Sequence, residues 1–183
     1  MIKKALIPIA DGTEEIEAVC IIDVLRRAET DVTVASVGEQ EITASRGVKI
    51  VADKLIEECT EEKYDLIALP GGMPGAEHLR DCQTLTKMLK DHAAAGRLYV
   101  AICASPVVVL QQENLLKGKK ATCHPAFADK LEDNSSAELP VVKDGNCITG
   151  KGPAVAIDFA LELVSALYGE KKAKEVALPM ATS

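Results

Sequence analysis

The chain has 183 residues, of which 48% are hydrophobic and 27% are charged, and its formal net charge is −7. This length fits a single domain over residues 1–183 with a substantial buried core, and the composition is typical of a globular protein. The negative charge argues against nucleic acid or an anionic membrane as the main partner, because both require clustered Lys and Arg. No stretch approaches the roughly eighteen apolar residues that a membrane span needs.

The six cysteines show neither a CxxC pair nor the paired spacing of metal ligands. The apolar run after Lys4 ends at Asp11, too soon for the core of a signal peptide with its cleavage site. We therefore expect free thiols in a reducing compartment, a cytoplasmic location, and neither a metal nor a cofactor.

Short apolar runs alternate with helical segments along the chain. Residues 4–9 are predicted to form a first strand, buried on both faces because its polar residues lie only at its ends. A helix to about Ala28 follows, for which Asp11 and Glu14 offer an N-cap with capping-box spacing. Further strands are expected at 31–36, 65–69, 98–102 and 121–123, hairpins at 41–51 and 141–149, and helices at 83–95 and 153–168.

Buried strands that alternate with helices predict an α/β fold, a parallel sheet with helices on both faces. Open sheets of this kind place their functional sites beyond the carboxyl ends of the strands. The segments 11–15, 70–75 and 103–106 fall at such ends. We expect these three segments to converge on one site.

Cys103 follows the wholly apolar segment 98–102 and has the small residues Ala101 and Ser105 two positions to either side, as in a nucleophile elbow. Pro106 suits the first turn of a helix. A thiol at a helix N-terminus lies at the positive end of the dipole, so we expect a lowered pKa and a reactive thiolate. The alternative is a buried structural cysteine, which is common in protein cores.

Glu15 lies in the first turn of the predicted first helix, with apolar residues after it on its own helical face. A carboxyl over such a face is desolvated and tends to keep its proton, and next to a thiolate it can donate that proton. The alternative is that Glu15 is a solvated acid at a helix start, which is the interpretation we favour for Glu14 and Glu17.

The segment 70–75 follows a buried strand and could hold an oxyanion with backbone N–H groups, although a plain tight turn is an equal alternative. Among the three histidines, His124 is the one placed to face a site, either as a base for the thiol or as a structural residue. His92 is expected on the surface of its helix. Cys123 is a candidate resolving thiol for Cys103, against the alternative of a buried bystander.

Together these residues resemble the ThiJ/PfpI superfamily, and specifically its DJ-one branch. The resemblance implies a flavodoxin-like sandwich that forms a homodimer, with an oxidation-prone nucleophile at Cys103 and a protonated Glu15 touching it. It also implies an oxyanion pocket formed by the N–H groups of Gly72 and Ala104. His124 would lie at the edge of that pocket, and Arg46 would approach it across the dimer interface. The similarity covers nearly the whole chain and lies in the segments 11–19, 23–28, 44–48, 69–72, 101–104, 124–125 and 152–153.

The resemblance also implies a function in oxidative and carbonyl stress. Relatives are described as glutathione-independent glyoxalases, which convert the small 2-oxoaldehyde methylglyoxal to lactate without a cofactor, and as deglycases of glycated substrates. The alternative is a non-enzymatic redox sensor or chaperone that uses the same oxidisable cysteine. The peptidase branch carries His directly after its cysteine, and Ala104 stands at that position here, so we expect no peptide cleavage.

Two positions depart from the pattern of these relatives. Ser105 stands where many carry glycine, and its side chain would narrow the pocket or add a hydroxyl beside the thiol. Gly150 and Lys151 stand where a Ser-Arg pair is common, so an anion contact at that place is an open question.

Overall fold

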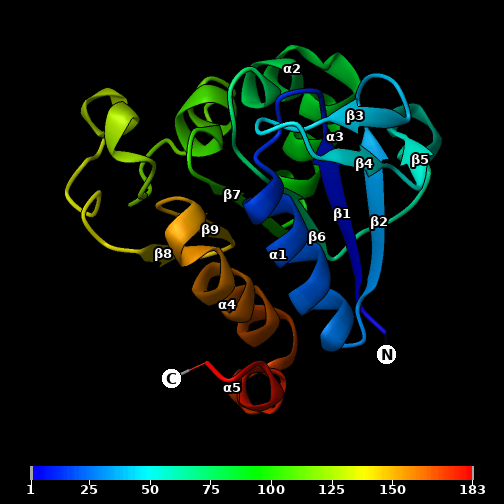
Figure 1. Cartoon of the computed structure of the whole chain (residues 1–183). Coiled ribbons are helices and arrows are strands. Elements are labelled where there is room, and N and C mark those ends of the chain that lie inside the picture. Colours follow the sequence, from blue (N-terminus) through cyan, green and yellow to red (C-terminus); the bar gives the residue numbers. More distant parts are fainter. Residues whose placement is uncertain (1, 183) are drawn as a thin grey trace.

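A seven-stranded β-sheet lies at the centre of the computed structural model, which describes residues 2–182 (Figure 1). All neighbouring strands run parallel except the last pair, an antiparallel hairpin at one edge. This arrangement confirms the predicted α/β fold with a mostly parallel sheet. In spatial order the strands are β5 (Lys54–Leu55), β2 (Asp31–Ser36), β1 (Lys4–Ile9), β6 (Leu66–Leu69), β7 (Leu98–Ile102), β9 (Cys147–Gly150) and β8 (Val141–Asp144), and a separate hairpin consists of β3 (Glu41–Thr43) and β4 (Lys49–Val51).

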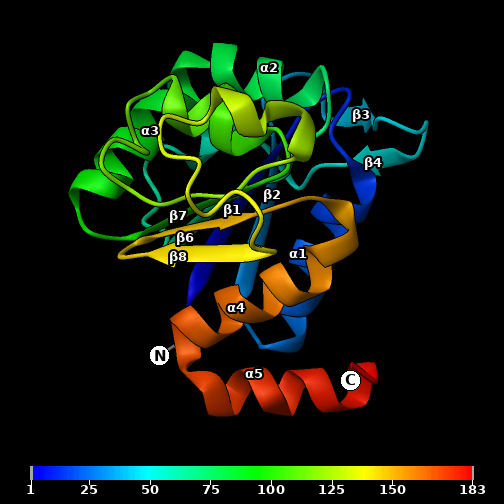
Figure 2. The same cartoon turned by 90° about the vertical axis from the view of Figure 1, so that its left-hand side faces the viewer.

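Helices cover both faces of the sheet (Figure 2). On one face α1 (Glu15–Arg27) packs against α4 (Ala156–Tyr168), and α5 (Glu170–Ala177) packs against α4 from outside. On the other face lie α2 (Gly75–Asp81) and α3 (Gln83–Ala94). In the described part of the chain no helix is long and apolar enough to cross a membrane. Short 3-10 turns occupy Ile56–Cys59, Pro125–Lys130, Pro153–Val155 and Leu178–Met180, and a π-helical turn occupies Pro106–Gln111.

The strands are apolar on both faces because each face is covered by helices. Every residue of β6 is buried, and in β1 only Lys4 is partly exposed. Side chains of α1 and α4, such as Ile21 and Phe159, close the core on one face, and Leu79 and Leu85 of α2 and α3 close it on the other. A sheet packed on both sides is rigid and fixes the positions of the loops at its strand ends.

One predicted strand does not form. The segment 121–123 has no strand pairing, because the Thr122 N–H donates to the Thr149 hydroxyl at 2.9 Å and the Thr122 hydroxyl donates to the Ala137 carbonyl at 2.9 Å. Side-chain hydrogen bonds therefore satisfy the polar groups that a strand ladder would have satisfied.

The cap of the first helix also differs from the prediction. Glu14 is the N-cap residue of α1, and its Oε2 accepts a 2.9 Å hydrogen bond from the Glu17 N–H. Asp11 instead accepts a 2.7 Å hydrogen bond from the Thr43 N–H and ties the loop after β1 to the β3–β4 hairpin. The turn after β1 is therefore longer than the capping-box pattern indicated.

Candidate active site

The loops after three adjacent strands meet at one edge of the sheet. The order β1-β6-β7 places the carboxyl ends of these strands side by side, as predicted from the sequence. The Glu14 N–H donates to the Gly71 carbonyl at 2.9 Å and joins the first loop to the second. A Cβ on Gly71 would lie only 2.7 Å from the Cβ of Cys103, so glycine is needed for the second loop to touch the third.

Cys103 occupies the sharp turn between β7 and the π-helical turn after it. Its φ of +65° is a left-handed conformation that is uncommon outside glycine. The Cys103 N–H donates to the Gly150 carbonyl at 2.9 Å, and the Cys103 carbonyl accepts from the His124 N–H at 2.8 Å. These bonds hold the residue in its strained conformation, which is the geometry expected of a nucleophile elbow.

Glu17 is the carboxyl that lies beside the Cys103 thiol. Its side chain is fully buried, and Oε2 accepts a 2.7 Å hydrogen bond from the Gly71 N–H. Within residues 2–182, Oε1 is buried without a hydrogen-bond partner, which leaves it available to the neighbouring thiol. We call these two residues the Cys103–Glu17 pair.

The prediction that Glu15 is the protonated carboxyl touching Cys103 is wrong. The Glu15 carboxylate accepts a 2.8 Å hydrogen bond from the Ser45 hydroxyl and another of 2.8 Å from the Arg46 N–H, so it anchors the β3–β4 hairpin. Partial burial raises the pKa of Glu15, but hydrogen bonds from its own N–H, Ser45 and Arg46 outweigh this and lower it below the usual 4.5. Glu15 is therefore ionised at neutral pH.

The helical period of α1 identifies the correct carboxyl. Glu17 lies one turn before Ile21 and two turns before Leu25, and all three belong to the buried stripe of the helix. Val19, which follows Glu15 by one turn, is 50% exposed. Apolar residues follow both carboxyls in the sequence, and the structure shows that the stripe with Ile21, not the one with Val19, is the buried one.

Burial sets the pKa values of the Cys103–Glu17 pair. It raises the pKa of Glu17 to about 7, although the Gly71 N–H and the thiol both act to lower it. Burial and then the charge of Glu17 raise the pKa of Cys103 to about 12, against the opposing effect of the Gly72 and Ala104 N–H groups. The thiolate is therefore favoured when Glu17 keeps the proton, because the repulsion between the two negative charges is then absent.

The predicted lowering of the Cys103 pKa by a helix N-terminus is therefore wrong. The segment after the elbow is a π-helical turn of six residues, Pro106–Gln111, too short for a strong dipole. The desolvation of the thiol and the charge of Glu17 outweigh the N–H groups that face the sulfur.

A pocket of about 340 Å³ opens over Cys103, whose side chain is 8% exposed. The Gly72 and Ala104 N–H groups hydrogen-bond to the sulfur and are placed to stabilise an anion formed there. Of the six residues predicted for the site, Glu15 alone is missing from the pocket lining. The other five, Cys103, Gly72, Ala104, His124 and Arg46, all line this pocket.

His124 and Arg46 contribute polar groups to the pocket edge. The His124 Nδ1 accepts a 3.2 Å hydrogen bond from the Ala126 N–H, so Nε2 carries the proton and offers a donor rather than a base. Arg46 lines the pocket of its own chain, and one of its guanidinium nitrogens bonds to the Ser45 carbonyl at 3.4 Å. The site is thus suited to a small substrate that carries carbonyl oxygens.

Comparisons with known proteins identify the family of the chain. Residues 3–166 match the DJ-1/PfpI family, which is most of the chain. The chain belongs to the DJ-1/PfpI family. The resemblance stated from the sequence motifs is therefore confirmed.

Individual members of the DJ-1/PfpI family are similar to the chain over nearly all of it. Protein DJ-1 homolog B of Arabidopsis thaliana is 50% identical over 173 residues, which are 94% of this chain, but the chain spans only 40% of that relative's length. Glutathione-independent glyoxalase DJR-1.2 of Caenorhabditis elegans is 33% identical over 97% of this chain and 96% of its own. The solved structure of oxidized Toxoplasma gondii DJ-1 has a TM-score of 0.96 at 49% identity and covers 99% of both chains.

One departure from the DJ-1/PfpI pattern follows from packing. A Cβ on Gly150 would lie 2.8 Å from Cδ2 of Phe159 and 2.9 Å from Cγ1 of Ile102, so glycine lets α4 pack against the end of β9. Lys151 donates to the Glu138 carboxylate at 3.0 Å and does not line the pocket. Lys151 therefore makes no anion contact beside Cys103.

Ser105 and Cys123 both lie next to the site without facing the pocket. The Ser105 hydroxyl donates to the Pro70 carbonyl at 2.6 Å, so it neither narrows the pocket nor contacts the sulfur. Cys123 is fully buried, its Sγ faces the His124 carbonyl at 3.4 Å, and burial raises its pKa to about 11. Nothing in this arrangement supports Cys123 as a resolving thiol.

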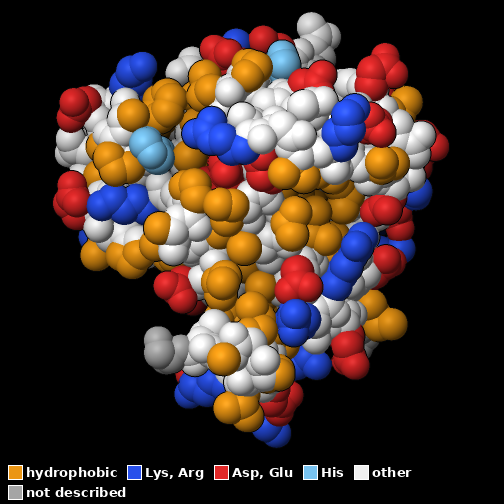
Figure 3. All heavy atoms as spheres, viewed as in Figure 1, with side chains coloured by type: hydrophobic (Ala, Val, Ile, Leu, Met, Phe, Trp, Pro, Cys, Tyr) orange, Lys and Arg blue, Asp and Glu red, His pale blue; other side chains and the backbone are white. Residues whose placement is uncertain are grey.

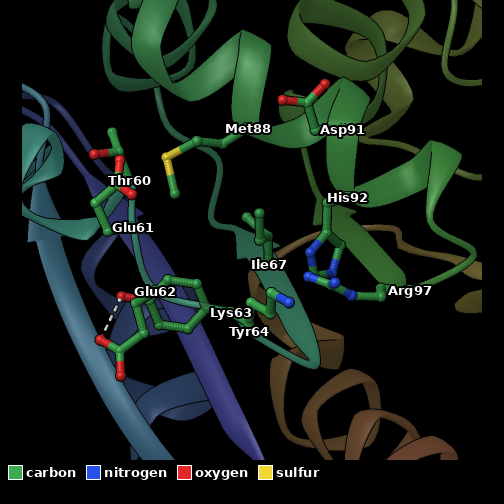
Figure 4. Close-up of a pocket in the computed structure, with 10 residues that line it drawn as sticks. All are labelled: Thr60, Glu61, Glu62, Lys63, Tyr64, Ile67, Met88, Asp91, His92 and Arg97. Carbon is green, nitrogen blue, oxygen red and sulfur yellow. Dashed lines mark hydrogen bonds between the residues drawn. The ribbon is translucent and has the colours of Figure 1, made fainter.

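A second pocket of about 340 Å³ lies at the amino ends of β6 and β7, away from Cys103 (Figure 4). Tyr64, which donates to Glu62 at 3.2 Å, forms part of its wall. His92 also lines it and is buried rather than on the surface as predicted, with Nε2 at 2.8 Å from the Leu98 carbonyl. No cysteine lines this pocket, and no cluster of three or more potential metal ligands occurs anywhere in residues 2–182.

Proposed function

We propose that the protein is a cofactor-independent, glutathione-independent glyoxalase that converts methylglyoxal to lactate. The observation that carries the proposal is the Cys103–Glu17 pair: a nucleophile at the floor of a pocket with two N–H donors, and a buried carboxyl next to its sulfur that can carry a proton. A relative that covers nearly the whole chain is named a glutathione-independent glyoxalase, which supports the same chemistry here. Glutathione is not required, because Cys103 itself supplies the sulfur.

The first step is addition of sulfur to the aldehyde. The Cys103 thiolate attacks the aldehyde carbon, and the Gly72 and Ala104 N–H groups stabilise the oxygen anion that forms. Glu17, protonated when the thiolate is present, gives its proton to this oxygen. The product is a hemithioacetal bound to Cys103 and a Glu17 carboxylate, so charge is balanced within the pocket.

The second step moves a proton between the two carbons of the substrate. The Glu17 carboxylate removes the hydrogen of the former aldehyde carbon as a proton and returns it to the neighbouring carbon through an enediol. This converts the hemithioacetal to a lactoyl thioester on Cys103. Water then cleaves the thioester, releases lactate, and restores the thiol.

Two other functions use the same residues. Protein deglycation would begin with the same attack by Cys103 on a glycated carbonyl. A redox sensor or chaperone function would use oxidation of Cys103, and the proton on Glu17 favours it, because a carboxylic acid can donate a hydrogen bond to a sulfinate oxygen. A role in oxidative and carbonyl stress fits both the enzymatic and the sensing alternatives.

Incubation of the purified protein with methylglyoxal, without added thiol, tests the proposed function. We expect lactate to form in an amount equal to the methylglyoxal consumed, and Cys103→Ser to lower kcat/KM by more than about 1,000-fold. Cys123→Ser is the matched control, since Cys123 is buried nearby but does not line the pocket. Activity that survives in Cys103→Ser, or consumption without lactate, would show that the proposal is wrong.

A further inference from the structure

Ser105 connects the elbow to the loop that follows β6. Its side chain is fully buried, and its hydroxyl donates a 2.6 Å hydrogen bond to the carbonyl of Pro70, which lies 35 residues earlier in the chain. A buried hydroxyl needs a partner, and many carbonyls could serve. The carbonyl that Ser105 contacts is joined to the N–H group that binds Glu17 of the Cys103–Glu17 pair.

The Pro70 carbonyl and the Gly71 N–H belong to one peptide group. A peptide group is planar, so the direction of its carbonyl also fixes the direction of its N–H. The Gly71 N–H donates to Glu17 Oε2 at 2.7 Å. A single rigid unit thus connects the Ser105 hydroxyl on one side to the Glu17 carboxyl on the other.

We propose that Ser105 is a positioning residue for the Cys103–Glu17 pair, acting through the Pro70–Gly71 peptide group. Its hydroxyl holds this peptide so that the Gly71 N–H fixes one oxygen of Glu17. The carboxyl then stays within hydrogen-bond reach of the Cys103 thiol. A hydrogen bond accepted at the carbonyl also polarises the peptide and strengthens the bond donated by its N–H.

Removal of the hydroxyl has a defined effect on titration. The Gly71 N–H acts to lower the pKa of Glu17, and a looser peptide weakens that bond. The pKa of Glu17 then rises further, and the pair gives up its proton at a higher pH. Glu17 then keeps the shared proton more often and the negative charge moves to the sulfur, so Cys103 becomes more reactive at and above neutral pH. At low pH, where both groups are protonated, the variant and the parent react alike.

The test is the pH dependence of Cys103 alkylation by iodoacetamide, followed by the mass of the peptide that contains Cys103. For Ser105→Ala we expect the midpoint to rise by about half to one pH unit, with a rate about three- to tenfold higher above the midpoint. Ser105→Gly should shift the midpoint in the same direction, so the test stands if one variant folds poorly. The rates of parent and variants should converge below about pH 6, where Glu17 is protonated in all of them.

Tyr99→Phe is the matched control. It removes another buried hydroxyl that donates to a backbone carbonyl, that of Leu115 at 2.8 Å, from the far end of β7. We expect it to lower stability without moving the midpoint. An unchanged midpoint in both Ser105 variants, or an equal shift in Tyr99→Phe, would overturn the proposal.

The inference concerns the same site as the proposed glyoxalase, but alkylation needs no aldehyde chemistry. A shifted midpoint in the Ser105 variants, together with a parent that forms no lactate, would support the role of Ser105 and contradict the glyoxalase. Lactate formation by the parent, together with an unchanged alkylation midpoint in the Ser105 variants, would support the glyoxalase and contradict the role of Ser105.

Discussion

Cys103 and Glu17 are buried next to each other. None of the groups that shift the pKa of either residue is a cation, so no positive charge offsets a negative charge on the pair. Two negative charges in one desolvated space are unfavourable, so the pair holds one proton over a wide range of pH. Near neutral pH the negative charge resides on the carboxylate or on the sulfur. The N–H groups of Gly72 and Ala104 stabilise a negative charge on the sulfur, and an electrophile in the pocket then reacts with the thiolate.

Oxidation of Cys103 should stop at the sulfinic acid because Glu17 can donate to it. Under mild peroxide we expect a gain of about 32 Da on the peptide that contains Cys103, which corresponds to two oxygen atoms. Glu17→Leu removes the donor and should reduce the accumulated sulfinate most, and Glu17→Gln, which keeps an N–H donor, should reduce it less. Peptide mass spectrometry over a peroxide time course measures this.

Glu15→Gln is the control for the oxidation experiment, because Glu15 is two residues away but bonds to Ser45 and Arg46. It should accumulate sulfinate like the parent. If Glu17→Leu also behaves like the parent, Glu17 does not stabilise the oxidised cysteine.

The raised pKa of Glu17 also predicts how stability depends on pH. The folded chain holds this proton up to about pH 7, whereas the unfolded chain releases it near 4.5. The stabilisation is therefore complete below pH 4.5 and is lost as the pH rises through 7. From about pH 5 to pH 8, we expect the unfolding free energy of the parent to fall by about 2–3 kcal/mol relative to Glu17→Gln.

Urea titrations of the parent and Glu17→Gln at several pH values measure this difference. Glu15→Gln should show the opposite trend, because hydrogen bonds lower the pKa of Glu15 in the folded chain. If the difference in unfolding free energy between the parent and Glu17→Gln does not change with pH, the pKa of Glu17 is the same in the folded and unfolded chain.

At the scale of elements, the loop from β6 to α2 depends on the absence of a side chain at Gly71. A Cβ there would lie 2.7 Å from the Cβ of Cys103 and 2.9 Å from the Ile102 carbonyl oxygen. Gly71→Ala should therefore cost about 1–3 kcal/mol, lower the melting temperature by roughly 3–10 °C, and slow Cys103 alkylation. Gly38→Ala is the control, since a Cβ at Gly38 would meet no atom within 4 Å.

Scanning calorimetry and alkylation of the same samples test this prediction. Only Gly71→Ala should show both effects. A parental melting temperature for Gly71→Ala would mean that the three loops pack less tightly than the structure indicates.

Most elements could be predicted because most buried strands are short, largely apolar runs, as in residues 98–102. The elbow was evident for a similar reason, since it requires small residues at fixed positions. The strand expected at 121–123 failed because Thr122 bonds through its side chain to segments distant in sequence. The helix α5 was not predicted, because it is strongly charged and buries only Val176.

The choice between Glu15 and Glu17 could not be made from local composition. Residues that are two positions apart in a helix are separated by about 200° around its axis, so Glu15 and Glu17 face nearly opposite sides of α1. Apolar residues follow both, and only the packing of α1 against the sheet and α4 decides which stripe is buried. The two N–H donors were predicted from the family resemblance, whereas the link from Ser105 to Glu17 requires the three-dimensional structure.

At the scale of the whole molecule, an apolar face remains uncovered. The helix α4, which is mostly apolar in sequence, is covered mainly by α1, α5 and the sheet. Figure 3 shows hydrophobic side chains along the face that carries α1 and α4. The exposed apolar residues of α1 and the nearby hairpin are Ile16 (53%), Val19 (50%), Val48 (50%) and Val51 (64%).

We therefore predict a homodimer that buries this face, because patches of this kind mark interaction surfaces. Light scattering at micromolar concentration should give about twice the 19.5 kDa of one chain. Ile16→Lys combined with Val19→Lys should give a folded monomer, whereas Leu139→Lys, at an equally exposed residue before β8, should not. A parent chain with the mass of a monomer would contradict the prediction.

The central claim is that Cys103 and Glu17 act together on a 2-oxoaldehyde, with Glu17 as the proton carrier. The most direct test is kcat/KM for methylglyoxal, measured from lactate, in the parent, Glu17→Gln and Glu15→Gln. We predict a loss of about 100- to 10,000-fold in Glu17→Gln, because its amide cannot exchange a proton, and a change of less than about threefold in Glu15→Gln. Full activity in Glu17→Gln, or a larger loss in Glu15→Gln, would contradict the account.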